Sequence, residues 1–265
     1  MKFTKMQGLG NDYVYVYSRR EPNNPEKLSI KLSDRHFGIG SDGMIWILPS
    51  KVADFKMRIF NADGSEAKMC GNGVRCVGKY VYDKGLTKKT EITVETLSGI
   101  KILNLKVKKN KVESVSVNMG KADAGLVNRL TVCDRDVEYI PVSVGNPHAV
   151  VFVDDITGAD ITTLGPAMEH NERFPDGVNV EFVQVISDEK LRMRVWERGS
   201  GVTMACGTGS CATVMAAISI GLCSYNKDIA VELDGGTLYI NIAEDNTVTM
   251  TGPAEISFEG EVILS

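Results

Sequence analysis

Cys70 and Cys206 stand in matching sequence settings. Cys70 lies in the sequence MCGNG at 69–73, and Cys206 lies in ACGTG at 205–209. Each turn delivers its cysteine to the predicted start of a helix, where unpaired N–H groups and the helix dipole favour a thiolate over a thiol. The glycines let an anion such as a carboxylate approach those N–H groups closely.

If two such turns face each other, a carboxylate held by both has a sulfur on either side. One sulfur could remove the proton next to the carboxylate while the other adds a proton on the opposite face, which inverts the stereocentre. A single cysteine at a helix start is more often a small buried hydrophobe, so the matched pair is what favours catalysis. Zinc is the alternative, but the spacings from Cys70 to Cys76 and from Cys206 to Cys211 are longer than the C-x2-C spacing of structural zinc sites. We predict no metal.

The turns that carry these cysteines belong to a longer internal repeat. Within the segments 60–86 and 195–222, Cys70 aligns with Cys206 and Gly85 with Gly221 at an offset of 136, and GNDYVYVYS from Gly10 aligns with GNPHAVVFV from Gly145 at 135. Val94 and Glu95 align with Val231 and Glu232 at an offset of 137. Collinear matches with single-residue drift indicate two related halves.

Alternating and β-branched runs predict a series of strands in each half, interrupted by one long helix that starts after the cysteine and ends at Gly85 or Gly221. Shorter helices are predicted at 26–35 and 160–171. The helix after Cys206 is apolar on nearly every face, so a sheet must wrap around it. We predict an α+β fold of two pseudo-symmetric domains, each a curved, mostly antiparallel sheet around a central helix. The first domain is residues 1–115 with a returning strand at 255–265, and the second is 116–254.

Composition limits the partners. The chain has 265 residues, of which 43% are hydrophobic and 24% charged, and its net charge is −4. These values exclude disordered and fibrous classes and leave no overall positive field for nucleic acid or an anionic membrane, so we predict a small-molecule partner. No signal peptide is recognisable and the apolar run at 212–222 is too short to span a bilayer, so we expect a cytoplasmic protein with free thiols. Four further cysteines are interpreted as packing residues: Cys76, Cys133, Cys211 and Cys223.

Two motifs resemble nucleotide-binding loops but lack their context. GIGSDG at 38–43 follows a predicted helix and precedes a strand, which reverses the order that a dinucleotide site requires. GVRCVGKY at 73–80 has Tyr80 where a P-loop has Ser or Thr. We therefore predict no nucleotide cofactor.

The chain closely resembles the diaminopimelate epimerase family, which belongs with the pyridoxal-phosphate-independent amino-acid racemases. The resemblance implies a pair of pseudo-symmetric domains, no cofactor and no metal. It also implies interconversion of LL- and meso-diaminopimelate for lysine and peptidoglycan precursor synthesis, and a homodimer. The motifs that carry it are GNDY at 10–13, RHFGIGSDG at 35–43, FNADGSEAKMCGNGVRC at 60–76, GNPH at 145–148, VN at 178–179 and WERGSGVTMACGTGSCA at 196–212.

The resemblance also implies roles for individual residues. Cys70 and Cys206 become the paired acid and base, and Glu197 and His148 tune the thiols and hold the reacting amino group. The N–H groups expected to bind the reacting carboxylate are those of Gly71, Asn72, Gly207 and Thr208. Asn11 is expected at the reacting end of the substrate, and the second amino-acid centre is expected to meet Arg198, Asn61, Asn146 and Asn179.

One position departs from the family pattern, because some members carry Gln where this sequence has Gly43. The contact which that Gln supplies is absent or replaced here.

Three other functions are alternatives. A proline or hydroxyproline racemase of the same fold typically reads MCGHG, and Asn72 in place of that His opposes it. An isomerase of the phenazine-biosynthesis type uses a carboxylate instead of two cysteines. A non-catalytic amino-acid-binding or thiol-redox protein is the alternative from another class.

Overall fold

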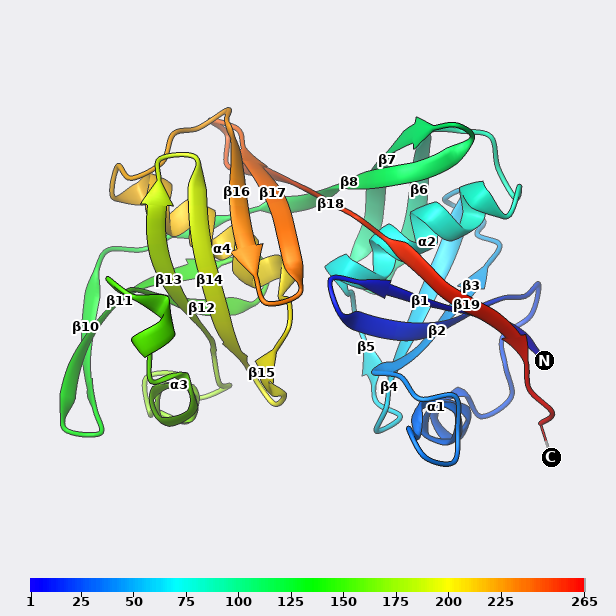
Figure 1. The fold of residues 1–265 in the computed structure, drawn as a ribbon, viewed down its shortest axis with the longest axis horizontal. Helices are drawn as coiled ribbons and strands as arrows, with labels where there is room; N and C mark the ends of the chain where they lie inside the picture. The colour runs from blue at the N-terminus through cyan, green and yellow to red at the C-terminus, as the bar shows by residue number, and fades with distance from the viewer. Residues whose placement is uncertain (265) are drawn as a thin grey trace. The chain divides into compact units, whose positions relative to one another are not determined.

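The computed structural model describes residues 1–264 and shows two compact units. Unit 1 is Met1–Val117 together with Gly252–Ser265, and unit 2 is Asn118–Thr251. The chain passes from one unit to the other within strand β8 (Lys111–Lys121) and again at the end of strand β18 (Thr247–Gly252). Unit 1 therefore contains both ends of the chain, which are marked in Figure 1.

In unit 1, strands pair in the order β19-β1-β2-β3-β4-β6-β7-β8. Two pairs, β2 with β3 and β4 with β6, are parallel, and the others are antiparallel. Short strand β5 forms a hairpin with β4. The bounds are β1 Lys2–Gly8, β2 Asn11–Tyr17, β3 Gly43–Leu48, β4 Phe55–Asn61, β5 Glu66–Ala67, β6 Glu91–Thr96, β7 Gly99–Lys108 and β19 Glu255–Glu261.

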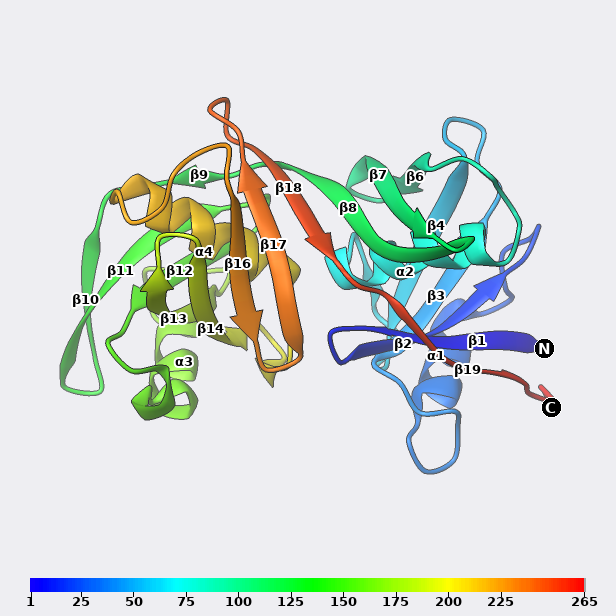
Figure 2. The same ribbon diagram turned by 45° about the horizontal axis from the view of Figure 1, so that its top comes forward.

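Unit 2 repeats this arrangement, with strands in the order β11-β12-β13-β14-β16-β17-β18. Its two parallel pairs, β12 with β13 and β14 with β16, correspond to those of unit 1. The repeated topology is the structural form of the sequence repeat, and the predicted fold class is confirmed (Figures 1 and 2). The bounds are β9 Asp123–Ala124, β10 Asn128–Val132, β11 Arg135–Ser143, β12 Pro147–Phe152, β13 Asn179–Ser187, β14 Lys190–Glu197, β15 Gly201–Thr203, β16 Asp228–Leu233 and β17 Gly236–Ile242.

Each sheet encloses one central helix, α2 (Gly71–Asp83) in unit 1 and α4 (Gly207–Ser219) in unit 2. α4 is buried at nearly every position and contacts seven strands of its unit, because a helix without a polar face must be covered on all sides. Both helices end before a glycine in the left-handed region, Gly85 with φ +73 and Gly221 with φ +77, as the sequence predicts.

A second helix packs on the outer face of each sheet: α1 (Pro25–Ser33) in unit 1 and α3 (Ile161–Glu169) in unit 2. Leu32 of α1 belongs to a core cluster with residues of β2, β3 and β4, and Met168 of α3 belongs to one with residues of β12 and β13. α1 and α3 follow the predicted helices at 26–35 and 160–171 to within two residues. A short 3-10 turn, Ile156–Gly158, precedes α3.

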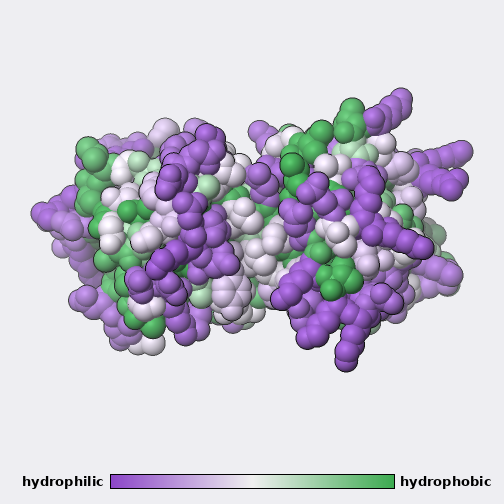
Figure 3. All heavy atoms as spheres, turned by 90° about the horizontal axis from the view of Figure 1, so that it is seen from above, coloured by the Kyte–Doolittle hydropathy of each residue, from purple (hydrophilic) through white to green (hydrophobic). Residues whose placement is uncertain are grey.

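The exposed surface is largely polar. Along much of β7 and β8, buried and exposed residues alternate, and the exposed residues include Lys106, Lys108 and Lys111. Figure 3 shows hydrophilic side chains over most of one face, with apolar residues between them. Within residues 1–264, no helix has the length and apolar character that crossing a membrane requires.

All six cysteines lie in the described part of the chain and are present as thiols. Cys76, Cys211 and Cys223 are buried, which agrees with a packing role. The same prediction is wrong for Cys133. This residue is exposed and has a positive φ in the tight turn between β10 and β11, where the hairpin requires a left-handed backbone.

Candidate active site

Cys70 is the N-cap residue of α2, and its backbone is extended. Its sulfur accepts a hydrogen bond from the Gly73 N–H at 3.3 Å, and the first backbone bond of the helix runs from Val74 N–H to the Cys70 carbonyl. Gly71 and Asn72 therefore occupy the first turn, where N–H groups precede the helical hydrogen bonds. This is the geometry that the sequence predicts for binding a carboxylate.

Asn11 connects the Cys70 thiol to a set of charges. The thiol donates to Asn11 Oδ1 at 3.3 Å, and Asn11 Nδ2 donates to Asp42 Oδ2 at 2.8 Å. Asp42 also accepts from the Asp12 N–H and from Arg35. Because a carboxylate can only accept, the Asn11 amide is fixed with its nitrogen toward Asp42 and its oxygen toward the sulfur.

Cys206 caps α4 in the same way. Its backbone is extended, and its sulfur accepts from the Gly209 N–H at 3.3 Å and lies 3.6 Å from Thr208 Oγ1. Gly207 and Thr208 form the first turn of the helix, as Gly71 and Asn72 do in unit 1. The repeat therefore places both cysteines at N-caps, each with one backbone N–H on its sulfur.

The electrostatics around Cys206 differ from the expectation of a lowered thiol pKa. Burial raises the pKa of Cys206 well above its ordinary value, and the charges of Glu197 and Glu181 raise it further. The N–H of Gly209 and the hydroxyl of Thr208 lower it, but burial dominates. Burial also raises the pKa of Glu197, and a hydrogen bond with the Cys206 thiol lowers it. The helix terminus alone therefore does not make Cys206 a thiolate.

His148 and Glu181 form a buried pair beside this cysteine. Their side chains are inaccessible to solvent, and His148 Nδ1 lies 2.7 Å from Glu181 Oε1. On its other side, His148 Nε2 lies 3.1 Å from Asn146 Oδ1, and Asn146 Nδ2 donates to Thr208 Oγ1 at 3.3 Å. A cavity of about 440 Å³ within unit 2 borders Asn146 and His148. Glu197 is held by the hydroxyl of Thr203.

Asn179 links this cluster to Arg198. Asn179 is buried, donates to the Pro147 carbonyl at 3.0 Å and accepts from the Arg198 N–H at 3.0 Å. The Arg198 guanidinium is exposed and donates to the Asp176 carbonyl at 2.8 Å. Four expected residues of unit 2, Asn146, His148, Asn179 and Arg198, are thus joined through short contacts.

Asn61 lies apart from this pattern. Its Nδ2 donates to Ser65 Oγ at 3.0 Å within the β4–β5 hairpin, and no described contact joins it to Cys70. Its backbone pairs with Gly43 of β3. A Cβ atom at Gly43 would lie 2.2 Å from the Phe60 carbonyl oxygen, so this backbone leaves no space for a side chain such as the expected Gln.

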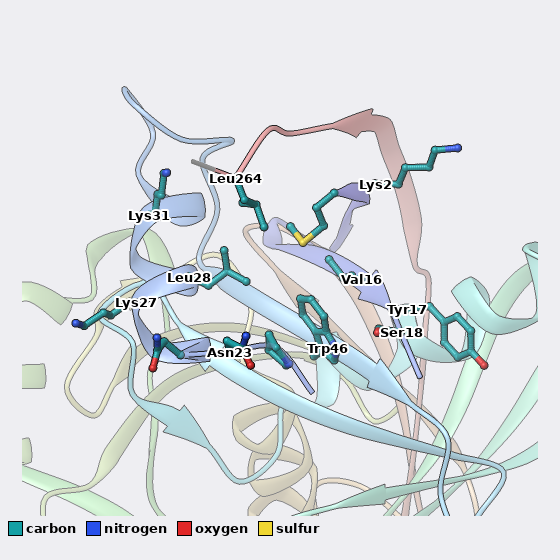
Figure 4. Close-up of a pocket in the computed structure, with 13 residues that line it drawn as sticks. Lys2, Val16, Tyr17, Ser18, Asn23, Lys27, Leu28, Lys31, Trp46 and Leu264 are labelled. Atoms are coloured by element: carbon teal, nitrogen blue, oxygen red, sulfur yellow. The ribbon is translucent and has the colours of Figure 1, made fainter. Parts of the chain in front are cut away.

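A separate groove of about 690 Å³ lies in unit 1, between the start of β1, the end of β2 and α1 (Figure 4). Trp46, Leu28 and three lysines line it, and none of the expected site residues does. Among residues 1–264, no group of three or more His, Cys, Asp or Glu side chains is placed to hold a metal ion.

Glu181 and Asp42 were not among the residues expected at the site. A signal for Glu181 exists, since it is the charged residue within the apolar strand sequence VNVEFV, two residues after Asn179 and on the same face of the strand. Asp42 lies in the motif RHFGIGSDG, but only the pairing of β2 with β3 brings it to Asn11.

The fold is shared with solved structures whose sequences differ widely from this one. A probable proline racemase from Agrobacterium radiobacter superposes with a TM-score of 0.75 at 15% identity, covering 100% of this chain and 93% of the other. A phenazine biosynthesis protein of the PhzF family from Bacillus anthracis gives 0.73 at 18% identity, covering 100% and 99%. Likenesses this distant establish the fold alone.

Sequence comparison is more specific. Residues 3–124 and 140–257 match the diaminopimelate epimerase family. Diaminopimelate epimerases from Agathobacter rectalis and Methanococcus maripaludis are 53% and 49% identical to this chain, with 99% of both chains covered in each case. The chain therefore belongs to the diaminopimelate epimerase family, whose members interconvert LL- and meso-diaminopimelate in lysine biosynthesis. Membership makes it an isomerase and sets aside the non-catalytic interpretation.

Proposed function

We propose that this chain epimerises diaminopimelate without a cofactor or metal, using Cys70 and Cys206 as a pair of acid–base groups. The observation that carries the proposal is the matched N-cap position of the two cysteines, each with a backbone N–H on its sulfur. Racemisation requires proton transfer on both faces of one carbon, so a chain with two equivalent proton carriers, one from each repeat, suits it.

In the proposed reaction one sulfur enters as a thiolate and the other as a thiol. The thiolate takes the proton from the α-carbon, and the electron pair of the broken C–H bond is delocalised into the neighbouring carboxylate. The thiol then gives its proton to the opposite face of the same carbon. The two sulfurs have exchanged protonation states, the stereocentre is inverted, and no redox change occurs.

The carboxylate at the reacting centre would be bound by backbone N–H groups of both helix starts. These donors face an anion at the positive end of a helix, and the negative charge on the carboxylate increases as the C–H bond breaks. The stabilisation is therefore greater in the transition state than in the ground state. The N–H groups concerned are those of Gly71, Asn72, Gly207 and Thr208.

The remaining residues would hold the substrate and tune the thiols. Glu197 and His148 flank Cys206 and would hold the reacting amino group, and Asn11 would serve the reacting end from unit 1. The guanidinium of Arg198 offers two parallel N–H donors to the carboxylate of the second centre. Asn61, Asn146 and Asn179 would supply neutral donors and acceptors there. We place the enzyme in the cytoplasm as a homodimer, serving both lysine and peptidoglycan synthesis.

Proton NMR of LL-diaminopimelate in heavy water, with the reduced protein, tests the proposal. We expect the α-proton signal to disappear and the meso isomer to form. L-proline serves as a comparison substrate, since exchange of proline without exchange of diaminopimelate would identify a proline-type racemase instead. Absence of exchange with both substrates would contradict the proposed activity.

A further inference from the structure

Glu181 is a buried carboxylate that the reaction described above does not use. It lies on β13, its side chain is inaccessible to solvent, and Oε2 has no hydrogen-bond partner among the described residues. A Cβ atom at Gly209 would lie 2.7 Å from Glu181 Oε1, so the close approach of this carboxylate to α4 depends on that glycine. Burying a carboxylate costs free energy unless the carboxylate is paired or hydrogen-bonded. The partner of Glu181 is His148.

The contacts of His148 fix where its protons lie. Asn146 Oδ1 can only accept, so the Nε2 atom 3.1 Å away carries a hydrogen. The remaining ring atom, Nδ1, lies 2.7 Å from Glu181 Oε1, and one further proton is shared between these two atoms. Whether that proton resides on His148 or on Glu181, the pair is electrically neutral and Nε2 remains a donor.

Because His148 Nε2 is a donor, the direction of each following hydrogen bond is also fixed. With its oxygen committed to His148, Asn146 donates from Nδ2 to Thr208 Oγ1 at 3.3 Å. The hydroxyl hydrogen of Thr208 is then available to the Cys206 sulfur, 3.6 Å away. A thiolate at Cys206 would receive this hydrogen in addition to the Gly209 N–H.

We propose that Glu181 is a positioning residue which, through His148, Asn146 and Thr208, directs a hydroxyl donor at the Cys206 sulfur and so assists its conversion to a thiolate. The proposal rests on Cys206 acting as a base in the reaction above. Within unit 2, the charged groups that act on this sulfur are Glu197 on β14 and Glu181 on β13, and His148 on β12 contacts Glu181. Burial and the Glu197 carboxylate oppose a thiolate, whereas the neutral His148–Glu181 pair adds no net charge, so a correctly directed donor has a large effect there.

The orientation of His148 can be measured without turnover. The chain has three histidines, so His36→Gln and His170→Gln variants assign the signals of His148 in ¹⁵N NMR. We expect Nε2 of His148 to carry a hydrogen, because it faces Asn146 Oδ1. In Glu181→Gln we expect the neutral Nδ1–H tautomer to gain population, because the Gln carbonyl can accept from Nδ1–H. A neutral Nδ1–H tautomer in the unmodified protein would overturn the proposal.

The effect on the thiol can be followed by alkylation of Cys206 with iodoacetamide as a function of pH, with mass spectrometry of the modified peptide. The background carries Cys70→Ser and Cys133→Asn, so neither of these thiols competes. We expect Glu181→Gln and Thr208→Val each to raise the midpoint of the curve of alkylation rate against pH by about one pH unit. At a fixed pH below the midpoint, modification would then be about tenfold slower. Thr208→Ser should retain the original midpoint, since it keeps the hydroxyl.

Glu169→Gln is the matched control, because Glu169 is another buried carboxylate of unit 2, bonded to Trp196 Nε1 and the Gly199 N–H outside this chain of contacts. We expect its midpoint to stay unchanged. An unchanged midpoint in Glu181→Gln would overturn the positioning role even if Cys206 proves essential for epimerisation. Conversely, a dispensable Cys206 would refute the proposed reaction whatever the alkylation shows.

Discussion

Asn11 and Asn146 occupy matched positions of the sequence repeat yet present opposite ends of their amides toward the two cysteine turns. Asn11 directs Oδ1 at the Cys70 sulfur, 3.3 Å away, whereas Asn146 directs Nδ2 at Thr208 beside Cys206. The difference follows from the neighbours, since Asn11 donates to the carboxylate of Asp42 and Asn146 accepts from His148. The repeat is therefore symmetric in backbone and asymmetric in hydrogen-bond polarity, which suits the proposed reaction, in which the two sulfurs start in different protonation states.

Replacing either paired cysteine should abolish epimerisation. We expect Cys70→Ala and Cys206→Ala each to reduce turnover of LL-diaminopimelate by at least about a hundredfold, because each removes one of two obligatory proton carriers. Conversion to the meso isomer measures the effect. Cys133→Asn is the control, since Cys133 is exposed in a hairpin turn with a positive φ, a conformation that Asn adopts readily. Near-normal turnover in either alanine variant would refute the two-thiol reaction.

Arg198→Lys should weaken substrate binding more than it slows turnover. A lysine cannot replace the two parallel N–H donors of a guanidinium, so we expect KM to rise about ten- to a hundredfold while kcat changes far less. Steady-state kinetics with diaminopimelate measures both. Arg194→Lys is the matched control from strand β14, which ends just before Arg198, because Arg194 pairs with Asp234. An Arg198→Lys variant that lowers kcat at unchanged KM would place Arg198 in the chemical step instead.

Cys76 should make the folded state sensitive to alkaline pH. Burial in α2 raises the pKa of this thiol from 9.0 to about 11. Between these two values the folded state keeps the thiol proton while the unfolded chain loses it. The contribution to the free energy of unfolding is therefore complete below about pH 9 and is lost as the pH rises through about 11. The full effect is about 3 kcal/mol.

Urea denaturation of the wild type and of Cys76→Ala, at about pH 8 and at about pH 10.5, measures this effect. We expect the free energy of unfolding to fall less with pH in the variant, whatever the cost of the lost side chain at the lower pH. The exposed Cys133→Asn variant should behave as the wild type. Equal pH dependence in Cys76→Ala and the wild type would contradict the expectation.

Gly43→Ala should destabilise unit 1. The added Cβ would lie 2.2 Å from the Phe60 carbonyl oxygen and 2.9 Å from the Tyr13 ring, and the backbone there is fixed by the β3–β4 pairing. We expect a loss of about 3 kcal/mol in the free energy of unfolding. Gly158→Ala, which meets only Asp155 Oδ2 at 3.8 Å, should change it little. Equal effects of the two substitutions would show that β3 and β4 tolerate a side chain at this position.

Much of the fold follows from the sequence because its signals are local. The apolar helix after Cys206, the glycines that end both central helices, and the long alternating runs each specify their own element. The sequence pattern does not predict six of the strands: β1, β5, β9, β10, β15 and β18. β5, β9 and β15 have only two or three residues, and the existence of such strands depends on the partner they pair with.

The repeat in the amino-acid sequence is enough to identify two matched pairs of residues, Cys70 with Cys206 and Asn11 with Asn146. Tertiary structure decided how each pair behaves. Asp42 reaches Asn11 through the parallel pairing of β2 with β3, and Glu181 reaches His148 through that of β12 with β13. Hydrogen-bond polarity and the pKa of a buried thiol depend on groups distant along the chain and on exclusion of water. A repeat of residue types can therefore predict where the thiols lie but not the protonation state of each one.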